Sequence, residues 1–185
     1  LKDDMTLDYN SVNDFSQRFK GKKRLIFGFT FMIWEYFAQA LANNIDLSDS
    51  IMIHSGGRKK LEDRAVNNTV FKKTMSDLFN ISVIHNFYGM VEQVGSIFME
   101  CEEGFFHAPN FADVHIVDTF SHQKLPFGNE GLIRVDSILP RSYPGHKLLT
   151  EDIGKIIGED NWKCGRKGKF FIVKGRLPKA EVRGC

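Results

Sequence analysis

Cysteine is scarce in this sequence: only Cys101, Cys164 and Cys185 occur among 185 residues. Three scattered cysteines cannot form the disulfide framework of a small secreted protein, and free thiols are typical of a reducing compartment. The N-terminus also lacks the charged, apolar and small-residue pattern of a secretion signal. We therefore expect a cytoplasmic protein.

Long hydrophobic runs and a strong charge bias are also missing. The most apolar stretch, Leu25 to Ala42, is interrupted by Glu35 and Gln39, so we expect no membrane span. Lys and Arg number 25 against 23 Asp and Glu, which gives a net charge of +2. A dedicated nucleic-acid-binding domain is usually more basic, so no nucleic-acid partner is expected. The basic clusters at 20–24 and 163–169 are interpreted as solvent-exposed faces, or alternatively as flanks of a phosphate site.

Several site motifs are absent as well. The sequence contains no Gly-x-Ser-x-Gly elbow and no Walker loop. The residues His85, Cys101, His107 and Cys164 do not show the spacing of zinc ligands, so a zinc site is not expected. His107 and His115 lie on predicted strands and are interpreted as packing residues.

Apolar residues are abundant, at 42% of the sequence with 17 Phe, so the chain can build a core. The first half alternates short apolar runs with stretches of helical periodicity. It predicts strands at 25–29, 50–54 and 81–87, and helices at 31–43 and 60–79. Thr30 is the expected cap of the first of these helices, and Val70 is an expected apolar position of the second. This order is typical of a parallel sheet covered by helices.

The second half has a different pattern, with short apolar runs separated by turns that contain Gly or Pro. This pattern predicts an antiparallel sheet or barrel. The predicted strands are 97–101, 105–107, 114–117, 131–136, 153–157 and 170–173. The expected fold class is therefore α/β, with a parallel α/β portion at 1–96 followed by an antiparallel β subdomain at 97–174.

Unusual residues follow three of the predicted parallel strands. They are Gly28-Phe29-Thr30, Ser55-Gly56-Gly57 and Tyr88-Gly89-Met90-Val91-Glu92. Ligands bind at the carboxyl ends of parallel strands. Taken singly, the glycines indicate a tight turn, Tyr88 a core aromatic and Glu92 a surface carboxylate. Taken together, the tyrosine ring could cover a nucleobase and the carboxylate could hold a hard cation such as Mg²⁺.

Two charged residues in the second half have a similar double interpretation. Asp152 precedes Ile-Gly, where it could form a turn or accept hydrogen bonds from two ribose hydroxyls. Arg176 follows Gly175 at the end of a strand, so its guanidinium could reach a phosphate or sugar oxygen.

These segments, in this order, resemble the motifs of the adenylate-forming superfamily of acyl-CoA synthetases and luciferases. Tyr88-Gly-Met-Val-Glu92 resembles its Tyr-Gly-x-Thr-Glu motif, and Gly56-Gly57 resembles its Gly-Gly loop. Thr150-Glu-Asp152 resembles its Thr-Gly-Asp motif, and Gly175-Arg176 the Gly-Arg of its hinge. The segments 164–170 and 175–185 look closest to the acyl-protein synthetase of the bacterial bioluminescence fatty-acid reductase complex.

The resemblance covers residues 25–185 and only the C-terminal half of the family. It implies that 175–185 are the hinge and the start of a C-terminal segment, with the upstream half and its phosphate loop absent. It also implies ATP-dependent activation of a carboxylic acid, with fatty acid the expected class, and transfer of the acyl group to a thiol. The expected cofactors are ATP and Mg²⁺, and the expected partner is an acyl-accepting protein such as a reductase.

Residue roles follow from the same resemblance. Tyr88, Gly89 and the Gly56-Gly57 loop would line the adenine pocket, Asp152 would bind the ribose, and Arg176 would reach the ribose or phosphate. Glu92 would be catalytic as the Mg²⁺ ligand. Cys185 would be catalytic as the acyl acceptor, since a thiolate is a good acyl nucleophile. An acyl site is expected at Phe27, Phe29 and Phe31, beside Trp34.

The sequence departs from the family at three positions. Val91 stands where the family has Thr, Glu151 replaces a Gly, and Pro178 stands at the place of the hinge Asp. The alternatives are a phenylacetate-type CoA ligase and a non-catalytic relative that binds a nucleotide or a partner. A soluble α/β domain with coincidental motifs is a further alternative.

Overall fold

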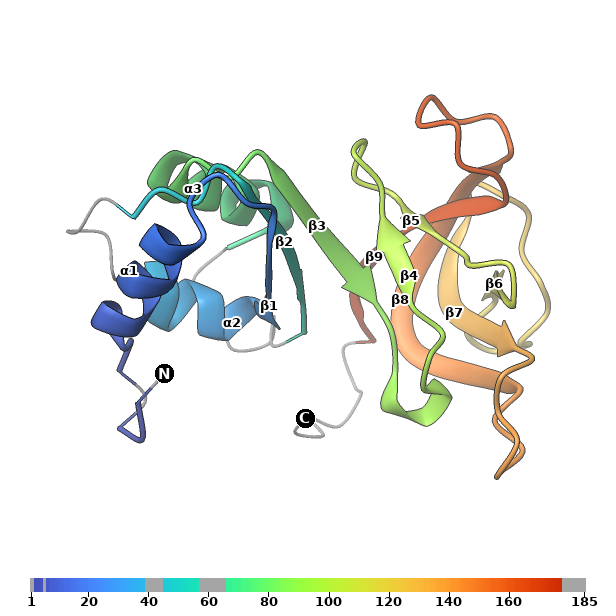
Figure 1. Cartoon of the computed structure of the whole chain (residues 1–185). Coiled ribbons are helices and arrows are strands. Elements are labelled where there is room, and N and C mark those ends of the chain that lie inside the picture. Colours follow the sequence, from blue (N-terminus) through green and yellow to red (C-terminus); the bar gives the residue numbers. More distant parts are fainter. Residues whose placement is uncertain (1, 5, 39–44, 57–65, 178–185) are drawn as a thin grey trace. The chain divides into compact units, whose positions relative to one another are not determined.

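The computed structural model describes residues 2–4, 6–38, 45–56 and 66–177 (Figure 1). The chain divides into two compact units, residues 1–86 and 87–185, which we describe one at a time. Within the described residues, no helix is long and apolar enough to cross a membrane. The subdomain boundary at residue 97, inferred above from the change in strand pattern, stays a prediction.

The first unit contains a parallel sheet in the order β1-β2-β3. Its register aligns Ile26 with Met52, and Met52 with Ile84. The elements in chain order are α1 (Tyr9–Arg18), β1 (Arg24–Phe29), α2 (Thr30–Met32), η1 (Ile33–Phe37), β2 (Ser50–Ser55), α3 (Asn68–Phe79) and β3 (Val83–Tyr88). The predicted alternation of strands and helices is confirmed.

One face of this sheet carries the core of the first unit. Ile26, Met52 and Ile84 pack there against residues of α1, η1 and α3. Helix α3 contributes Phe71, Met75 and Phe79, which are four residues apart and therefore lie on one side of the helix. The prediction for Val70 is wrong, because its side chain is 42% exposed and Phe71 takes the buried position.

The opposite face of β1 is exposed and apolar. Leu25, Phe27 and Phe29 alternate along the strand, so their side chains point to the same side. Their exposed fractions are 63%, 68% and 59%. A strand that is apolar on both faces is typical of parallel sheets that are covered on both sides.

Two local predictions in this unit are wrong. Thr30 does not cap a helix: α2 has Phe29 at its N-cap position, and the buried Thr30 hydroxyl lies 2.9 Å from His54 Nδ1. A buried imidazole needs a polar partner, and this need outweighs the capping preference. Arg24 is not on a solvent-exposed basic face, because it is buried and its guanidinium donates to Ser16 Oγ at 3.2 Å.

The predicted helix at 31–43 begins at Thr30 and changes to π-helical geometry at Ile33–Phe37. Its predicted C-terminal part falls on residues 39–43, which lie outside the described residues. Single π-helical turns are uncommon and are not encoded by a simple apolar period, so the apolar stripe could not predict this change.

The second unit is an antiparallel sheet that starts from the last two residues of β3. Phe87 pairs with Met99, and Tyr88 pairs with Phe98. From there the strand order is β4-β5-β9-β8-β7-β6. Its elements are η5 (Val91–Gln93), β4 (Phe98–Glu100), β5 (Phe106–His107), β6 (Ala112–Val117), β7 (Glu130–Ser137), β8 (Lys147–Glu159) and β9 (Lys169–Arg176).

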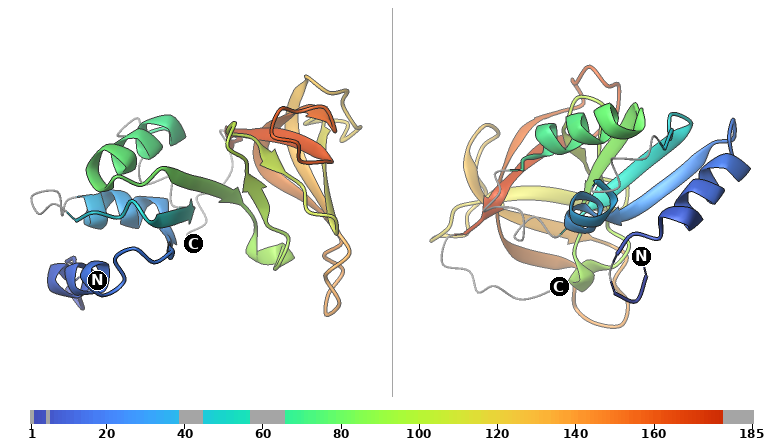
Figure 2. Two further views of the ribbon diagram at one scale, coloured as in Figure 1. Left: turned by 45° about the horizontal axis from the view of Figure 1, so that its top comes forward. Right: turned by 90° about the vertical axis from the view of Figure 1, so that its left-hand side faces the viewer.

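The long strand β8 bends along its length, as both views in Figure 2 show. Its pairing shifts register once against β7 and twice against β9, and such bulges increase the local twist and bend of a sheet. One shift follows Ile153, next to Gly154, whose added Cβ would lie 2.7 Å from the Ile172 carbonyl oxygen. Phe98, Phe171 and their apolar neighbours form the core. The predicted fold class, a parallel α/β portion followed by an antiparallel sheet, is confirmed.

Candidate functional site

Tyr88 is the last residue of β3 and lies over the aromatic core of the second unit. Its ring centroid is 6.0 Å from that of Phe98, 6.3 Å from Phe106 and 6.1 Å from Phe171. These rings hold the tyrosine side chain in one place while leaving it half-buried. The site therefore has a rigid aromatic surface of the kind that can cover a flat ligand.

The Tyr88 hydroxyl donates a 2.8 Å hydrogen bond to Asp152 Oδ2. Burial raises the pKa of Tyr88 far above its ordinary value, and the neighbouring Asp152 carboxylate adds to this effect. The hydroxyl therefore remains a proton donor throughout the neutral range. The bond links the end of β3 to the middle of β8.

Asp152 is positioned by the strands around it. It lies opposite Arg176 in the pairing of β8 with β9, and Arg176 Nε is 3.7 Å from Asp152 Oδ1. The backbone N–H of Asp152 donates to Thr150 Oγ1 at 3.1 Å. The buried Thr150 hydroxyl in turn donates to the Ile133 carbonyl at 2.8 Å. One carboxylate oxygen thus accepts from Tyr88, while the other faces a cation.

Glu92 lies in the short turn η5, next to Val91, and both side chains are exposed. Within the described part of the chain, the Glu92 carboxylate makes no hydrogen bond or ion pair, so it is available to a cation. Gly89 stands between Tyr88 and this turn, where an added Cβ would lie 3.2 Å from Ile97 Cδ1. Among the described contacts, none links Glu92 to Tyr88, Asp152 or Arg176.

Gln93 is a positioning residue that the sequence analysis missed. It is buried, and its side-chain amide donates to the Gly145 carbonyl at 2.9 Å. A buried amide anchored in this way fixes the turn that carries Glu92. Its sequence signal was a polar residue between Glu92 and Val94, which is too common to be informative.

The remaining predicted site residues are in the first unit or outside the described residues. Gly56 follows β2 with φ +70°, and an added Cβ would lie 3.3 Å from Phe29 Cδ1. Only glycine adopts this conformation readily. Gly57, Pro178 and Cys185 lie outside the described residues.

Comparison with known proteins adds the family and the fold. A family model described as acyl-protein synthetase, LuxE, matches residues 3–185. No curated protein matches the sequence. ATP-bound MatB from Rhodopseudomonas palustris has a similar structure, with 16% identity and a TM-score of 0.60 over 92% of this chain and 33% of that one.

Two other solved structures are similar. An open conformation of 2-hydroxyisobutyryl-CoA ligase, in complex with 2-HIB-AMP and CoA, has 14% identity and a TM-score of 0.71 over 92% of this chain and 37% of that one. A luciferase-like enzyme from the mealworm Zophobas morio has 15% identity and a TM-score of 0.60, over 93% and 42%. The chain thus spans between a third and a little over two-fifths of the length of these three structures.

These structural relatives are adenylate-forming enzymes, and the likeness shows the fold. The family model covers nearly the whole sequence. Both findings agree with the resemblance carried by the motifs at Tyr88, Asp152 and Arg176. The chain belongs to the acyl-protein synthetase family, LuxE, and has part of the adenylate-forming fold.

Proposed function

We propose that the protein containing this chain activates a carboxylic acid with ATP and passes the acyl group to a cysteine thiol. The observation that carries the proposal is the group formed by Tyr88, Asp152 and Arg176. It combines a fixed aromatic surface, a carboxylate and a guanidinium within one antiparallel sheet. An adenine ring, a ribose and a phosphate need these three kinds of partner.

Each residue has a distinct role in this proposal. The Tyr88 ring packs on adenine, with Gly89 beside it. Adenine binding by the Gly56-Gly57 loop is proposed from its motif alone. Asp152 accepts hydrogen bonds from the ribose hydroxyls, and its bond from Tyr88 fixes the orientation of the carboxylate. Arg176 contacts the ribose or a phosphate oxygen.

Glu92 is the proposed ligand of Mg²⁺. Its exposed carboxylate is free of hydrogen bonds to described residues, and oxygen ligands of this kind are what Mg²⁺ prefers. A bound Mg²⁺ would neutralise charge on the phosphates of ATP. Val91, in the position of the motif threonine, supplies no hydroxyl to a phosphate, so this contact must come from elsewhere.

The reaction has two steps. A substrate carboxylate oxygen attacks the α-phosphorus of ATP, a new P–O bond forms, and the bond to the β-phosphate breaks to release pyrophosphate. The Cys185 thiolate then attacks the acyl carbon, a C–S bond forms, and AMP leaves. A partner reductase is the proposed next acceptor. The exposed residues Phe27 and Phe29 suit a fatty acyl chain, because they form an apolar row.

Acid-dependent exchange of pyrophosphate into ATP tests the activation step, with a panel of fatty acids and the full-length protein. We expect exchange in the wild type and a roughly 100-fold loss of the exchange rate in Glu92→Gln. The neutral amide would hold Mg²⁺ poorly, so the negative charge that develops on the phosphates would lose its counter-ion. The matched control is Glu103→Gln, which changes an exposed carboxylate at the β4–β5 turn. Absence of exchange with every acid, or equal rates in both variants, would refute the proposal.

Labelling of the protein by radioactive fatty acid tests the thiol step. We expect ATP-dependent labelling that hydroxylamine removes and that Cys185→Ser abolishes. CoA-dependent release of AMP that Cys185→Ser leaves unchanged would instead indicate a phenylacetate-type CoA ligase. Binding of ATP without any exchange would indicate a non-catalytic relative.

A further inference from the structure

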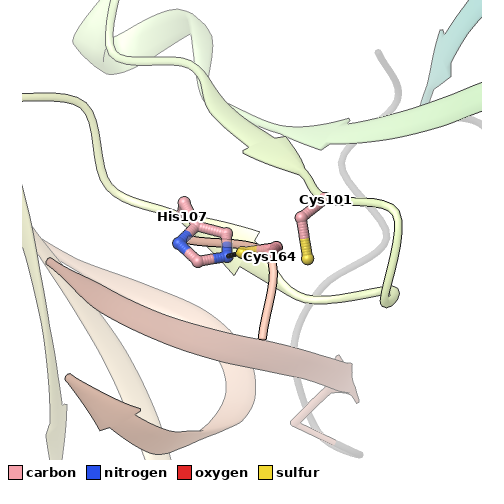
Figure 3. A group of neighbouring side chains, drawn as sticks. All are labelled: Cys101, His107 and Cys164. Atoms are coloured by element: carbon pink, nitrogen blue, oxygen red, sulfur yellow. Dashed lines mark hydrogen bonds between the residues drawn. The ribbon is translucent and has the colours of Figure 1, made fainter. Parts of the chain in front are cut away.

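Two cysteines and a histidine of the second unit lie close together (Figure 3). Cys101 follows β4, His107 ends β5, and Cys164 lies in the connection between β8 and β9. One ligand atom from each residue lies within 4.8 Å of the other two. Cys101 and His107 are buried, Cys164 is half-buried, and both thiols are free.

The spacing of these atoms suits a tetrahedral metal ion. Cys164 Sγ is 3.4 Å from His107 Nε2. Zinc binds sulfur at about 2.3 Å and nitrogen at about 2.0–2.1 Å, so tetrahedral angles place such a pair about 3.6 Å apart. The two thiolate sulfurs and the imidazole nitrogen are also ligands that zinc takes from proteins. We propose that Cys101, His107 and Cys164 hold a Zn²⁺ ion, with water at the fourth position.

Charge near the cluster supports this assignment. Two thiolates balance the charge of a divalent ion, so the complex is neutral. Arg166, in the same connection as Cys164, forms a paired contact with Glu102 at 2.8 and 3.0 Å. Burial, and then the positive charge of Arg166, lower the pKa of His107.

The environment of His107 Nδ1 limits the affinity that we expect for Zn²⁺. In a complex through Nε2, the proton of His107 must be on Nδ1. This buried atom has no hydrogen-bond partner among the described residues. Loss of such a partner usually costs metal sites roughly 10–100-fold in affinity. We therefore expect a site that a strong chelator can empty.

The distance from Asp152 separates this site from the proposed acyl activation. In the pairing of β8 with β9, Asp152 lies opposite Arg176, whereas Glu159 lies opposite Lys169 at the other end of the strands. At about 3.3 Å per residue, these positions, seven residues apart, are roughly 23 Å apart along β8. A metal ion bound by Cys101, His107 and Cys164 would link the β8–β9 connection to the β4–β5 hairpin. This link does not depend on the proposed acyl activation.

Zinc analysis of the full-length protein, purified without a histidine tag and dialysed against metal-free buffer, tests the proposal. We expect one Zn²⁺ per chain in the wild type, and a chelator should lower the thermal midpoint. Substitution by Co²⁺ should give thiolate-to-cobalt charge-transfer bands and the visible bands of a tetrahedral ion. Cys164→Ser and His107→Gln each remove a direct ligand and should weaken Zn²⁺ binding by more than the roughly 10–100-fold that loss of an outer-shell partner costs.

The matched controls are Cys185→Ser and His146→Gln, which remove a thiol and an exposed imidazole elsewhere in the sequence and should keep full zinc content. Zinc retained by both Cys164→Ser and His107→Gln would overturn the proposal. So would a wild type without stoichiometric zinc, or one in which Cys101 and Cys164 form a disulfide. If Cys164→Ser does not fold, the cobalt spectrum of the wild type decides alone.

Discussion

The hydrogen bond from Tyr88 to Asp152 can be tested by removing one oxygen atom. Tyr88→Phe keeps the ring that packs on three phenylalanines and deletes only the donor of the 2.8 Å bond. Hydrogen bonds to charged groups contribute about 1.5–3 kcal/mol. The Asp152 side chain is 20% exposed, so water can replace part of the lost bond, and we expect the lower end, about 1.5 kcal/mol.

Urea unfolding of wild type, Tyr88→Phe, Asp152→Ala and the double variant measures this energy as a cycle. If the bond accounts for the loss, the two single changes should not add, and the coupling energy should be about 1–1.5 kcal/mol. Tyr143→Phe is the control, because its side chain is exposed. A Tyr88→Phe protein within about 0.3 kcal/mol of wild type, or a coupling near zero, would refute this account.

Three further outcomes follow from the described contacts. The pKa of Tyr88 is raised in the folded state. The hydroxyl therefore contributes fully to stability below the unfolded pKa of about 10, and this contribution is lost as the pH rises above that value. Tyr88→Phe should weaken this alkaline loss of stability in thermal melts between pH 9 and 11. Gly154→Ala should lower the free energy of unfolding in urea by about 1–3 kcal/mol, because the new Cβ would lie 2.7 Å from a backbone oxygen. Gly28→Ala should lower it less, because its Cβ meets only the Ile33 side chain, at 3.3 Å. Equal losses in the two variants would contradict the reasoning. Asn67→Ala removes the side-chain acceptor of the Val70 N–H at 2.9 Å and should cost about 1 kcal/mol in the same assay, whereas no change would show that α3 does not depend on this cap.

Local patterns were sufficient to predict most strands. Short apolar runs, and turns that contain Gly or Pro, marked β1, β2 and β3 and the antiparallel strands, because these signals depend on neighbours in the sequence. The π-helical turn at Ile33–Phe37 and the buried position of Thr30 were not predictable in this way. Both depend on tertiary contacts, and the Thr30 partner, His54, is 24 residues away.

The candidate site residues show the same limit. Motif spacing proposed Tyr88 and Asp152 one by one, but not the hydrogen bond between them, because 64 residues separate the two. The cluster of Cys101, His107 and Cys164 had no spacing signal for a related reason. Its third member, Cys164, arrives through the β8–β9 connection, 57 residues after His107.

The most direct test of the proposed nucleotide site is the effect of Asp152→Asn on acid-dependent pyrophosphate exchange by the full-length protein. The asparagine keeps the size of the side chain but removes the charge that the ribose hydroxyls and Arg176 face. We predict a KM for ATP raised at least about ten-fold, since a charge-assisted hydrogen bond of this kind contributes about 1.5–3 kcal/mol, with the KM for the fatty acid unchanged. An unchanged KM for ATP, or a change confined to the fatty acid, would contradict the account.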